Sequence, residues 1–154
     1  MKAKRKVLIV TDGSDGTGKM AAGIAAALKG NKVLVKSASE FKGNDILPAE
    51  VFFLGCEKPN PDSFAYLADL LKHINLAGRP CGVFSPSSEK AVRYLAGLVH
   101  DSEAVLYPEP FTGSDNVPKV GEPRSNRTSV GIPGAAVKKW AQKVISGFLP
   151  ETST

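Results

Sequence analysis

The sequence predicts an α/β fold with three layers, in which a doubly wound, five-stranded parallel sheet is covered by helices on both faces. Five short apolar runs recur along the chain, and segments with a helical spacing of apolar residues follow most of them. Each run is apolar at nearly every position, which is typical of strands buried on both faces of a parallel sheet. The predicted strands are residues 7–12, 32–36, 51–55, 81–85 and 104–107.

The first half of the chain alternates strand, helix and strand. The run VLIVTD at 7–12 leads into a glycine-rich loop, and a helical period of apolar residues then extends over 18–29. We expect Gly30 to end this helix, because glycine readily adopts the left-handed conformation that follows a helix. The second strand, which begins with KVLV, is followed by a weakly patterned connection over 36–50.

The second half of the chain repeats the alternation and adds a last helix. Apolar residues recur at helical spacing in three segments, at Phe64, Leu67, Leu71 and Ile74, at Ala91, Val92, Leu95, Leu98 and Val99, and at Val137, Trp140, Ala141, Val144, Ile145 and Phe148. A Pro/Gly-rich stretch over 108–134 has no periodicity, so we expect a functional loop or flap there. No internal repeat or boundary is visible, which predicts a single domain over 1–154.

Composition and charge exclude several classes of protein. The 154 residues are 42% hydrophobic and 23% charged, as in a globular protein, and no run approaches the roughly 20 apolar residues of a membrane helix. The apolar segment near the N-terminus is too short for a signal peptide, so we expect a cytoplasmic protein that binds no membrane. The net charge of +5 comes from residues 1–6 and 117–154. A nucleic-acid-binding protein would show a basic face interleaved with aromatic residues, and the sequence has no such pattern, so we predict no nucleic-acid binding.

The two cysteines are expected to be free thiols. Cys56 follows the third predicted strand, and Cys81 begins the fourth. In a parallel sheet these positions lie at opposite ends, too far apart for a disulfide. Two free thiols fit a reducing compartment.

The loop TDGSDGTGKMA after the first strand contains two overlapping phosphate-binding patterns. Gly13, Gly18 and Lys19 have the spacing of a nucleotide P-loop. That motif requires a serine or threonine hydroxyl next, to bind Mg²⁺, and Met20 offers only a thioether. The motif also needs an aspartate at the end of a neighbouring strand, but the third strand ends in Gly55-Cys56-Glu57, the fourth in Ser85 and the fifth before Pro108. Only Glu57 is a candidate, so an ATP- or GTP-hydrolysing site is not predicted.

From its start to about residue 150, the chain resembles the flavodoxin-like family. The resemblance is carried by VFFLGC at 51–56 and by PDSFAYLADLLKHINLAGRPCGVFS at 61–85, which match the family's third strand, following helix, turn and fourth strand. The resemblance implies a strand order of 2-1-3-4-5. Ligands of such sheets bind at the carboxyl ends of the strands, where the order reverses.

The resemblance also implies a site for flavin mononucleotide (FMN), bound through a phosphate-binding loop. In the family's loop, backbone N–H groups and hydroxyls wrap the phosphate ahead of a helix N-terminus. Thr17 and Gly18 match this pattern, Asp15 and Met20 stand where the family has hydroxyl residues, and Asp12 adds a second negative charge beside the loop. The cofactor-binding residues implied are Ser14, Asp15, Gly16, Thr17, Gly18, Lys19, Cys56 and Ser85.

Two functions remain open at this point. The first is an FMN-binding protein, either an electron carrier with a redox partner protein or a small flavin reductase. The alternative is a flavin-free binding or interaction module. The loop CEKPNP has no aromatic residue to stack on the flavin, which leaves Tyr107 or Phe111 as candidates. We predict no metal site and no catalytic residue, because His73 and His100 fall toward the other end of the sheet.

Overall fold

A computed structural model describes residues 6–28, 30–46, 48–86, 88–107, 110–112 and 133–148. Most of the predicted loop over 108–134 therefore lies outside the described residues. In the last helix, the side chains of 137–145 are described, so the predicted core position of Phe148 also lies outside.

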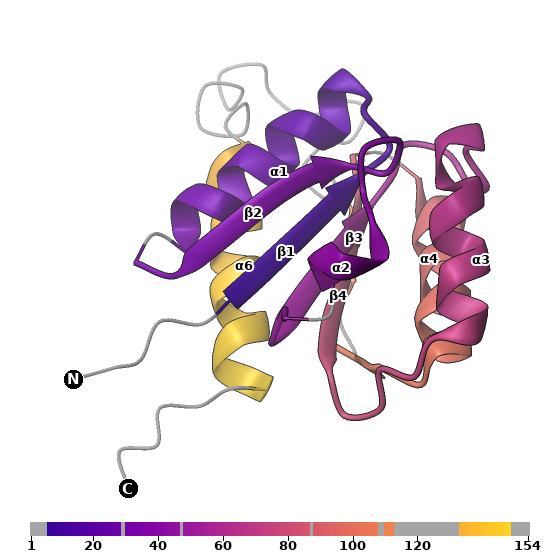
Figure 1. Cartoon of the computed structure of the whole chain (residues 1–154). Coiled ribbons are helices and arrows are strands. Elements are labelled where there is room, and N and C mark those ends of the chain that lie inside the picture. The colour runs from indigo at the N-terminus through magenta and orange to yellow at the C-terminus, as the bar shows by residue number, and fades with distance from the viewer. Residues whose placement is uncertain are drawn as a thin grey trace, which may run out of the picture.

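The sheet has the predicted parallel arrangement and strand order (Figure 1). Its strands, in spatial order, are β2 (Lys32–Ser37), β1 (Lys6–Thr11), β3 (Val51–Gly55), β4 (Pro80–Ser85) and β5 (Val105–Leu106). Every pair of neighbours is parallel, including β1 with β3. The order 2-1-3-4-5 is thus confirmed.

The fifth strand position is divided into two short pieces. β5 pairs with the start of β4, at Pro80 and Cys81. A further strand, β6 (Phe111–Thr112), pairs with the end of β4, at Phe84 and Ser85. The sequence predicted the first piece within 104–107, and the second falls in the stretch that was expected to be a loop.

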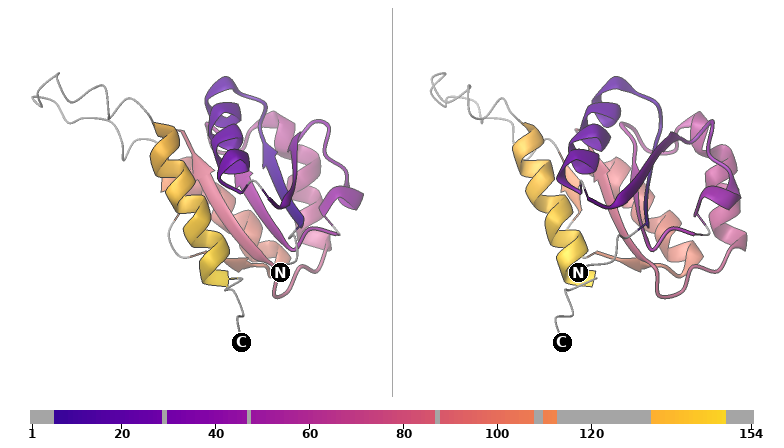
Figure 2. Two further views of the ribbon diagram at one scale, coloured as in Figure 1. Left: turned by 90° about the vertical axis from the view of Figure 1, so that its left-hand side faces the viewer. Right: turned by 60° about the vertical axis from the view of Figure 1, so that its left-hand side comes forward.

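Helices cover both faces of the sheet, which confirms the three layers (Figures 1 and 2). α1 (Asp15–Ala27) and α6 (Pro133–Phe148) lie side by side on one face. The other face carries α2 (Gly43–Ile46), the short 3-10 helix η1 (Asp62–Phe64), α3 (Ala65–His73) and α4 (Glu89–Ser102). Among the described helices none is long and apolar enough to cross a membrane.

The core consists of two apolar clusters, one on each face of the sheet. Val7 and Ile9 of β1 belong to the cluster under α1 and α6, and Leu8 and Val10 belong to the cluster under α3 and α4. Successive side chains of a strand point to opposite faces, and both faces are covered here. This explains why the strand sequence is continuously apolar.

Trp140 of α6 closes the first cluster. Its ring contacts Phe53, Phe84 and Phe111, with centroid distances of 5.5, 6.2 and 5.7 Å. These three residues come from β3, β4 and β6, so one side chain ties the C-terminal helix to three strands.

Both cysteines are free, as predicted, and both are buried. Cys81 pairs in register with Phe52 of β3. Cys56 lies four residues beyond Phe52, roughly 13 Å along the strand direction at about 3.3 Å per residue. A disulfide needs Cα atoms within roughly 7 Å, so the sheet itself holds the two thiols apart.

Candidate functional site

Three loops meet at the carboxyl edge of the sheet, following β1, β3 and β4. The backbone N–H of Glu57 donates a hydrogen bond to the Asp12 carboxylate at 2.8 Å. A methyl group on Gly16 would lie 3.1 Å from a carboxyl oxygen of Glu57 and 3.2 Å from Pro86. The first turn of α1 is therefore in close contact with the loops that follow β3 and β4.

Asp12 is the centre of the hydrogen bonds in this site. One oxygen of its carboxylate accepts the backbone N–H of Ser14 at 3.0 Å and the Ser14 hydroxyl at 2.7 Å, and the other oxygen accepts the N–H of Glu57. Burial alone raises the pKa of Asp12, but the bonds from Glu57, Ser14 and Thr17 outweigh it, and the pKa lies below its ordinary value of 3.8. Asp12 is therefore an anion at neutral pH.

The hydroxyls of Ser14 and Thr17 are part of the same network. The Ser14 Oγ lies 2.7 Å from the Thr17 Oγ1 as well as 2.7 Å from Asp12. A hydroxyl has one proton and an ionised carboxylate can only accept, so the Ser14 proton points to Asp12. The Thr17 hydroxyl, which is buried, bonds to the same carboxylate. Both hydroxyls that the sequence offered to a phosphate are thus directed toward Asp12.

The N-terminus of α1 keeps backbone donors of its own. The N–H of Gly18 donates to the Ser14 carbonyl at 2.8 Å. The N–H groups of Asp15, Gly16 and Thr17 have no hydrogen-bond partner in the described part of the chain. Such donors, together with the positive end of the helix dipole, favour an anion. Lys19 is exposed one position beyond this first turn.

Two further acids oppose an anion at this helix end. Asp15 is exposed in the first turn of α1. The carboxylate of Glu57 lies beside Gly16, as the space around that glycine shows. With Asp12, three acidic side chains lie in or beside the start of α1. Among the described residues no group of acids, histidines and cysteines could hold a metal ion.

The structure brings the predicted site residues of the loop together but buries the other two. Ser14, Asp15, Gly16, Thr17, Gly18 and Lys19 form the start of α1 and its N-cap. Cys56 follows β3 and Ser85 ends β4, at the same edge of the sheet, and both residues are 0% exposed. The Ser85 hydroxyl accepts the N–H of Ser88 at 3.2 Å. A role for these residues in binding a cofactor stays a prediction.

The Cys56 thiol is unreactive in this setting. Burial, and then the negative charge of Asp12, raise the pKa of Cys56 to about 12. A thiol acts as a nucleophile or ligand only as its thiolate. Cys56 is therefore a buried neutral side chain at neutral pH.

The sequence missed two residues of this region, and no short pattern points to either. Tyr94 of α4 has a buried hydroxyl without a hydrogen-bond partner among the described residues, and the pKa of Tyr94 is raised by burial and by nearby Cys56. Pro86 closes the space beside Gly16. Both depend on the packing of α4 and β4 against the β3 edge.

The residues considered for contact with a flavin ring belong to the core instead. Phe111 is 8% exposed and packs on Trp140. Tyr107 is partly buried against the same cluster. Met20, at the last hydroxyl position of the family's loop, is 7% exposed in that cluster too, so its side chain packs beneath α1.

Comparison with solved structures shows that this architecture is similar to that of flavodoxins. An oxidised flavodoxin from Bacillus cereus aligns over 92% of this chain and 99% of its own, with a TM-score of 0.70 and 18% identity. The chain has the flavodoxin-like fold. A flavodoxin variant from Fusobacterium nucleatum, bound to flavin mononucleotide, aligns over 94% of this chain and 98% of its own, with a TM-score of 0.70 and 13% identity.

The reduced Megasphaera elsdenii flavodoxin aligns over 86% of this chain and 98% of its own, with a TM-score of 0.60 and 23% identity. No family model matches the sequence, and no curated protein matches it. At these identities the likeness establishes the flavodoxin-like fold, and the site must be judged from its own residues.

The described residues fit the phosphate of FMN better than its ring. Three unpaired N–H groups of α1 can donate hydrogen bonds to an anion. Within the described residues of the loops after β3 and β4, at 56–61 and at 86 and 88, there is no aromatic side chain. The phosphate end of a flavin therefore has donors, while the ring has no stacking partner from those residues.

Proposed function

We propose that the protein binds FMN weakly at the carboxyl edge of its sheet and acts as an electron carrier or a small flavin reductase. The observation that carries the proposal is the set of unpaired N–H groups of Asp15, Gly16 and Thr17, at the start of the 13-residue helix α1. The flavodoxin-like fold supports it, since one structural neighbour is a flavodoxin bound to FMN. An electron carrier would also require a redox partner protein.

The residues of α1 would hold the phosphate of FMN. The N–H groups of 15–17 would donate to its oxygens, and exposed Lys19 would add a positive charge. When bound, FMN supplies the electron-transfer chemistry, and the protein supplies position and electrostatics. Gly16 lets the start of α1 pack closely against Glu57 and Pro86, because a methyl group at this position would crowd both.

The network of Asp12 explains why this binding is weak. The hydroxyls of Ser14 and Thr17 would have to leave Asp12 before they could donate to a phosphate. One hydrogen bond to a charged group contributes about 1.5–3 kcal/mol, which corresponds to roughly one to two decades in affinity. Repulsion from Asp15 and Glu57 lowers the affinity further. We therefore expect a protein that is colourless when purified.

A flavin-free binding module is the second candidate function. The observation that favours it is the Asp12 carboxylate, which already takes the donors of Ser14 and of Glu57 N–H. In this case the loop is complete without a ligand, and the flavodoxin-like fold serves as a scaffold for interaction with a partner.

Two glycine variants distinguish these functions. Gly16→Ala would place a methyl group 3.1 Å from Glu57 and 3.2 Å from Pro86, so the start of α1, which carries the unpaired N–H groups, would have to move away from the loops after β3 and β4. Gly18→Ala is the matched control, because no atom lies within 4 Å of its added methyl group. FMN is titrated into each protein while its fluorescence is followed, with inorganic phosphate as competitor.

We expect saturable quenching of FMN fluorescence by the native protein and by Gly18→Ala, and at least a tenfold loss of affinity in Gly16→Ala. Equal affinities in both variants would show that FMN binds elsewhere. No quenching by the native protein at millimolar FMN would refute the proposal and leave the flavin-free module.

A further inference from the structure

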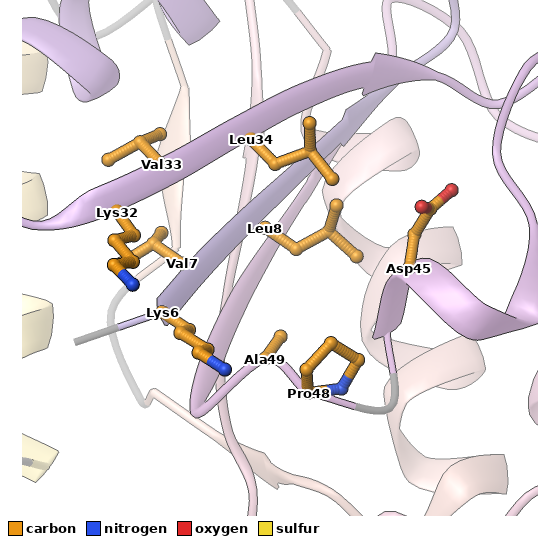
Figure 3. Close-up of a pocket in the computed structure, with 9 residues that line it drawn as sticks. All are labelled: Lys6, Val7, Leu8, Lys32, Val33, Leu34, Asp45, Pro48 and Ala49. Atoms are coloured by element: carbon orange, nitrogen blue, oxygen red, sulfur yellow. The ribbon is translucent and has the colours of Figure 1, made fainter.

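An apolar groove lies along the β2 edge of the sheet, on the face that carries α2 and away from the loops of the candidate FMN site. Its cavity volume is about 350 Å³. Figure 3 shows Leu8 and Leu34 side by side on β1 and β2, with Pro48 and Ala49 next to them. Lys6 and Lys32 line the end of the groove at the start of the two strands.

The groove exists because β2 is poorly covered. α2 is only four residues long, and it stands over β1 and β3 more than over β2 (Figure 1). Leu34 is 42% exposed and Val35 is 46% exposed, whereas Leu8 of the neighbouring strand is 1% exposed. β2 thus presents apolar side chains to solvent on both faces of the sheet.

Within the described part of the chain, the backbone of β2 is also unpaired on its outer side. β2 is the last strand of the sheet and pairs only with β1 among the described residues. Its six residues pair with β1 one to one, without a bulge, and contain no proline. An edge of this kind is a template for a further strand, because its outward N–H and C=O groups have no partner.

The charges along β2 select the kind of strand that fits. Alternate residues of a strand share a face, so Lys32, Leu34 and Lys36 point the same way, and Lys6 lies beside Lys32 in register. An antiparallel second copy centred on Leu34 would place Lys32 opposite Lys36 twice, and like charges in such pairs are destabilising. Asp45, which also lines the groove, accepts the N–H of Lys42 at 2.9 Å.

We propose that β2 and its groove bind an extended segment of an acidic partner protein as an added edge strand. The segment would carry one large apolar residue opposite Leu34 and an aspartate or glutamate two positions away on each side. The apolar residue packs against Leu34 over the groove, and the acids face Lys32 and Lys36. Main-chain hydrogen bonds to a sheet edge supply the affinity in this mode, and alternate side chains supply the specificity.

The probe is a fluorescein-labelled nonapeptide with isoleucine at its centre, glutamate two positions away on each side and threonine elsewhere. Binding to the full chain is measured by fluorescence anisotropy. Two control peptides replace both glutamates by lysine, or the central isoleucine by serine. We expect saturable binding of the acidic peptide and at least a tenfold weaker affinity for each control, since both charge pairs or the apolar contact are lost.

Three variants locate the binding. Leu34→Glu should abolish binding of the acidic peptide. Lys32→Glu should weaken binding of the acidic peptide and strengthen binding of the lysine peptide. Val105→Glu is the matched control, because Val105 is 43% exposed on β5, at the opposite edge of the sheet. Circular dichroism and tryptophan fluorescence verify that each variant is folded.

Four results would overturn the proposal. They are absence of saturation at millimolar acidic peptide, equal affinity for the lysine peptide, unchanged binding by folded Leu34→Glu, and equal loss in Val105→Glu. Sedimentation that shows a dimer of the native chain and a monomer of Leu34→Glu would assign this edge to a second copy instead.

Discussion

Replacing Asp12 by asparagine tests the network that organises the carboxyl edge. The substitution keeps the shape of the side chain and removes its charge. Aspartate accepts bonds on both oxygens, from Ser14 on one and from the Glu57 N–H on the other. Asparagine has one oxygen and one NH₂ group, so it must turn a donor toward one of these donors. At least one charge-assisted bond is lost and one N–H group is left unpaired.

The expected cost of Asp12→Asn is about 1.5–3 kcal/mol in the free energy of unfolding, the range for a hydrogen bond to a charged group. Urea denaturation at pH 7 measures it. Asp15→Asn is the matched control: it removes the same charge from the same loop, but Asp15 is exposed and makes no hydrogen bond among the described residues. The free energy of unfolding of Asp15→Asn should differ from that of the native protein by no more than about 0.5 kcal/mol.

The pH dependence gives an independent check. The pKa of Asp12 is lower in the folded protein than its ordinary value of 3.8. A lowered folded pKa stabilises the protein above the unfolded pKa, and this contribution is lost as the pH falls through the folded pKa. The difference in the free energy of unfolding between the native protein and Asp12→Asn should therefore be constant from pH 5 to 7 and shrink below about pH 4. Equal stabilities of the two asparagine variants at pH 7 would refute the role given to Asp12.

Three further predictions concern the core. Cys56 and Cys81 should react with a thiol reagent at pH 8 only after unfolding, because burial raises the pKa of both thiols; rapid modification of the folded protein would contradict their placement. Tyr94→Phe should leave the free energy of unfolding unchanged or raise it by up to about 1 kcal/mol, since it removes a buried hydroxyl without a partner among the described residues. A clear decrease in the free energy of unfolding, measured by urea denaturation, would show that the hydroxyl is bonded. Trp140→Ala should cost about 3–5 kcal/mol, measured by thermal and urea unfolding, and a cost below about 1 kcal/mol would mean that α6 is not docked on the sheet.

The strands and their order could be predicted because burial on both faces leaves a direct trace in the sequence. VLIV, VFFLG and CGVFS show no alternation of apolar and polar residues, and each is buried in the structure. The run KVLV looks the same, yet Leu34 and Val35 of β2 are exposed. Whether a helix covers an edge strand depends on where the connecting segment runs in the fold. The composition of the strand does not reveal this. β6 was missed because two residues are too few to show a period.

The position of the loop that carries the candidate site could be predicted, but the hydrogen bonds within it could not. The strand, loop and helix around Ser14 to Lys19 follow from glycine positions and apolar spacing. The bonds of Asp12 do not, because its partner Glu57 is 45 residues away and meets it only when β1 and β3 are neighbours. Likewise, the burial of Met20 and Phe111 reflects the docking of α6, which the pattern of the loop cannot show.

The contacts of Trp140 affect the order in which the chain can fold during synthesis. Phe53, Phe84 and Phe111 are made well before α6, and until residues 133–148 have left the ribosome the face that carries these rings has no cover from α6. The first four strands can pair earlier, since their partners are already present. The nascent chain therefore passes through a stage in which the sheet is paired and α1 alone covers this aromatic face, and apolar surface exposed at such a stage can aggregate or recruit chaperones.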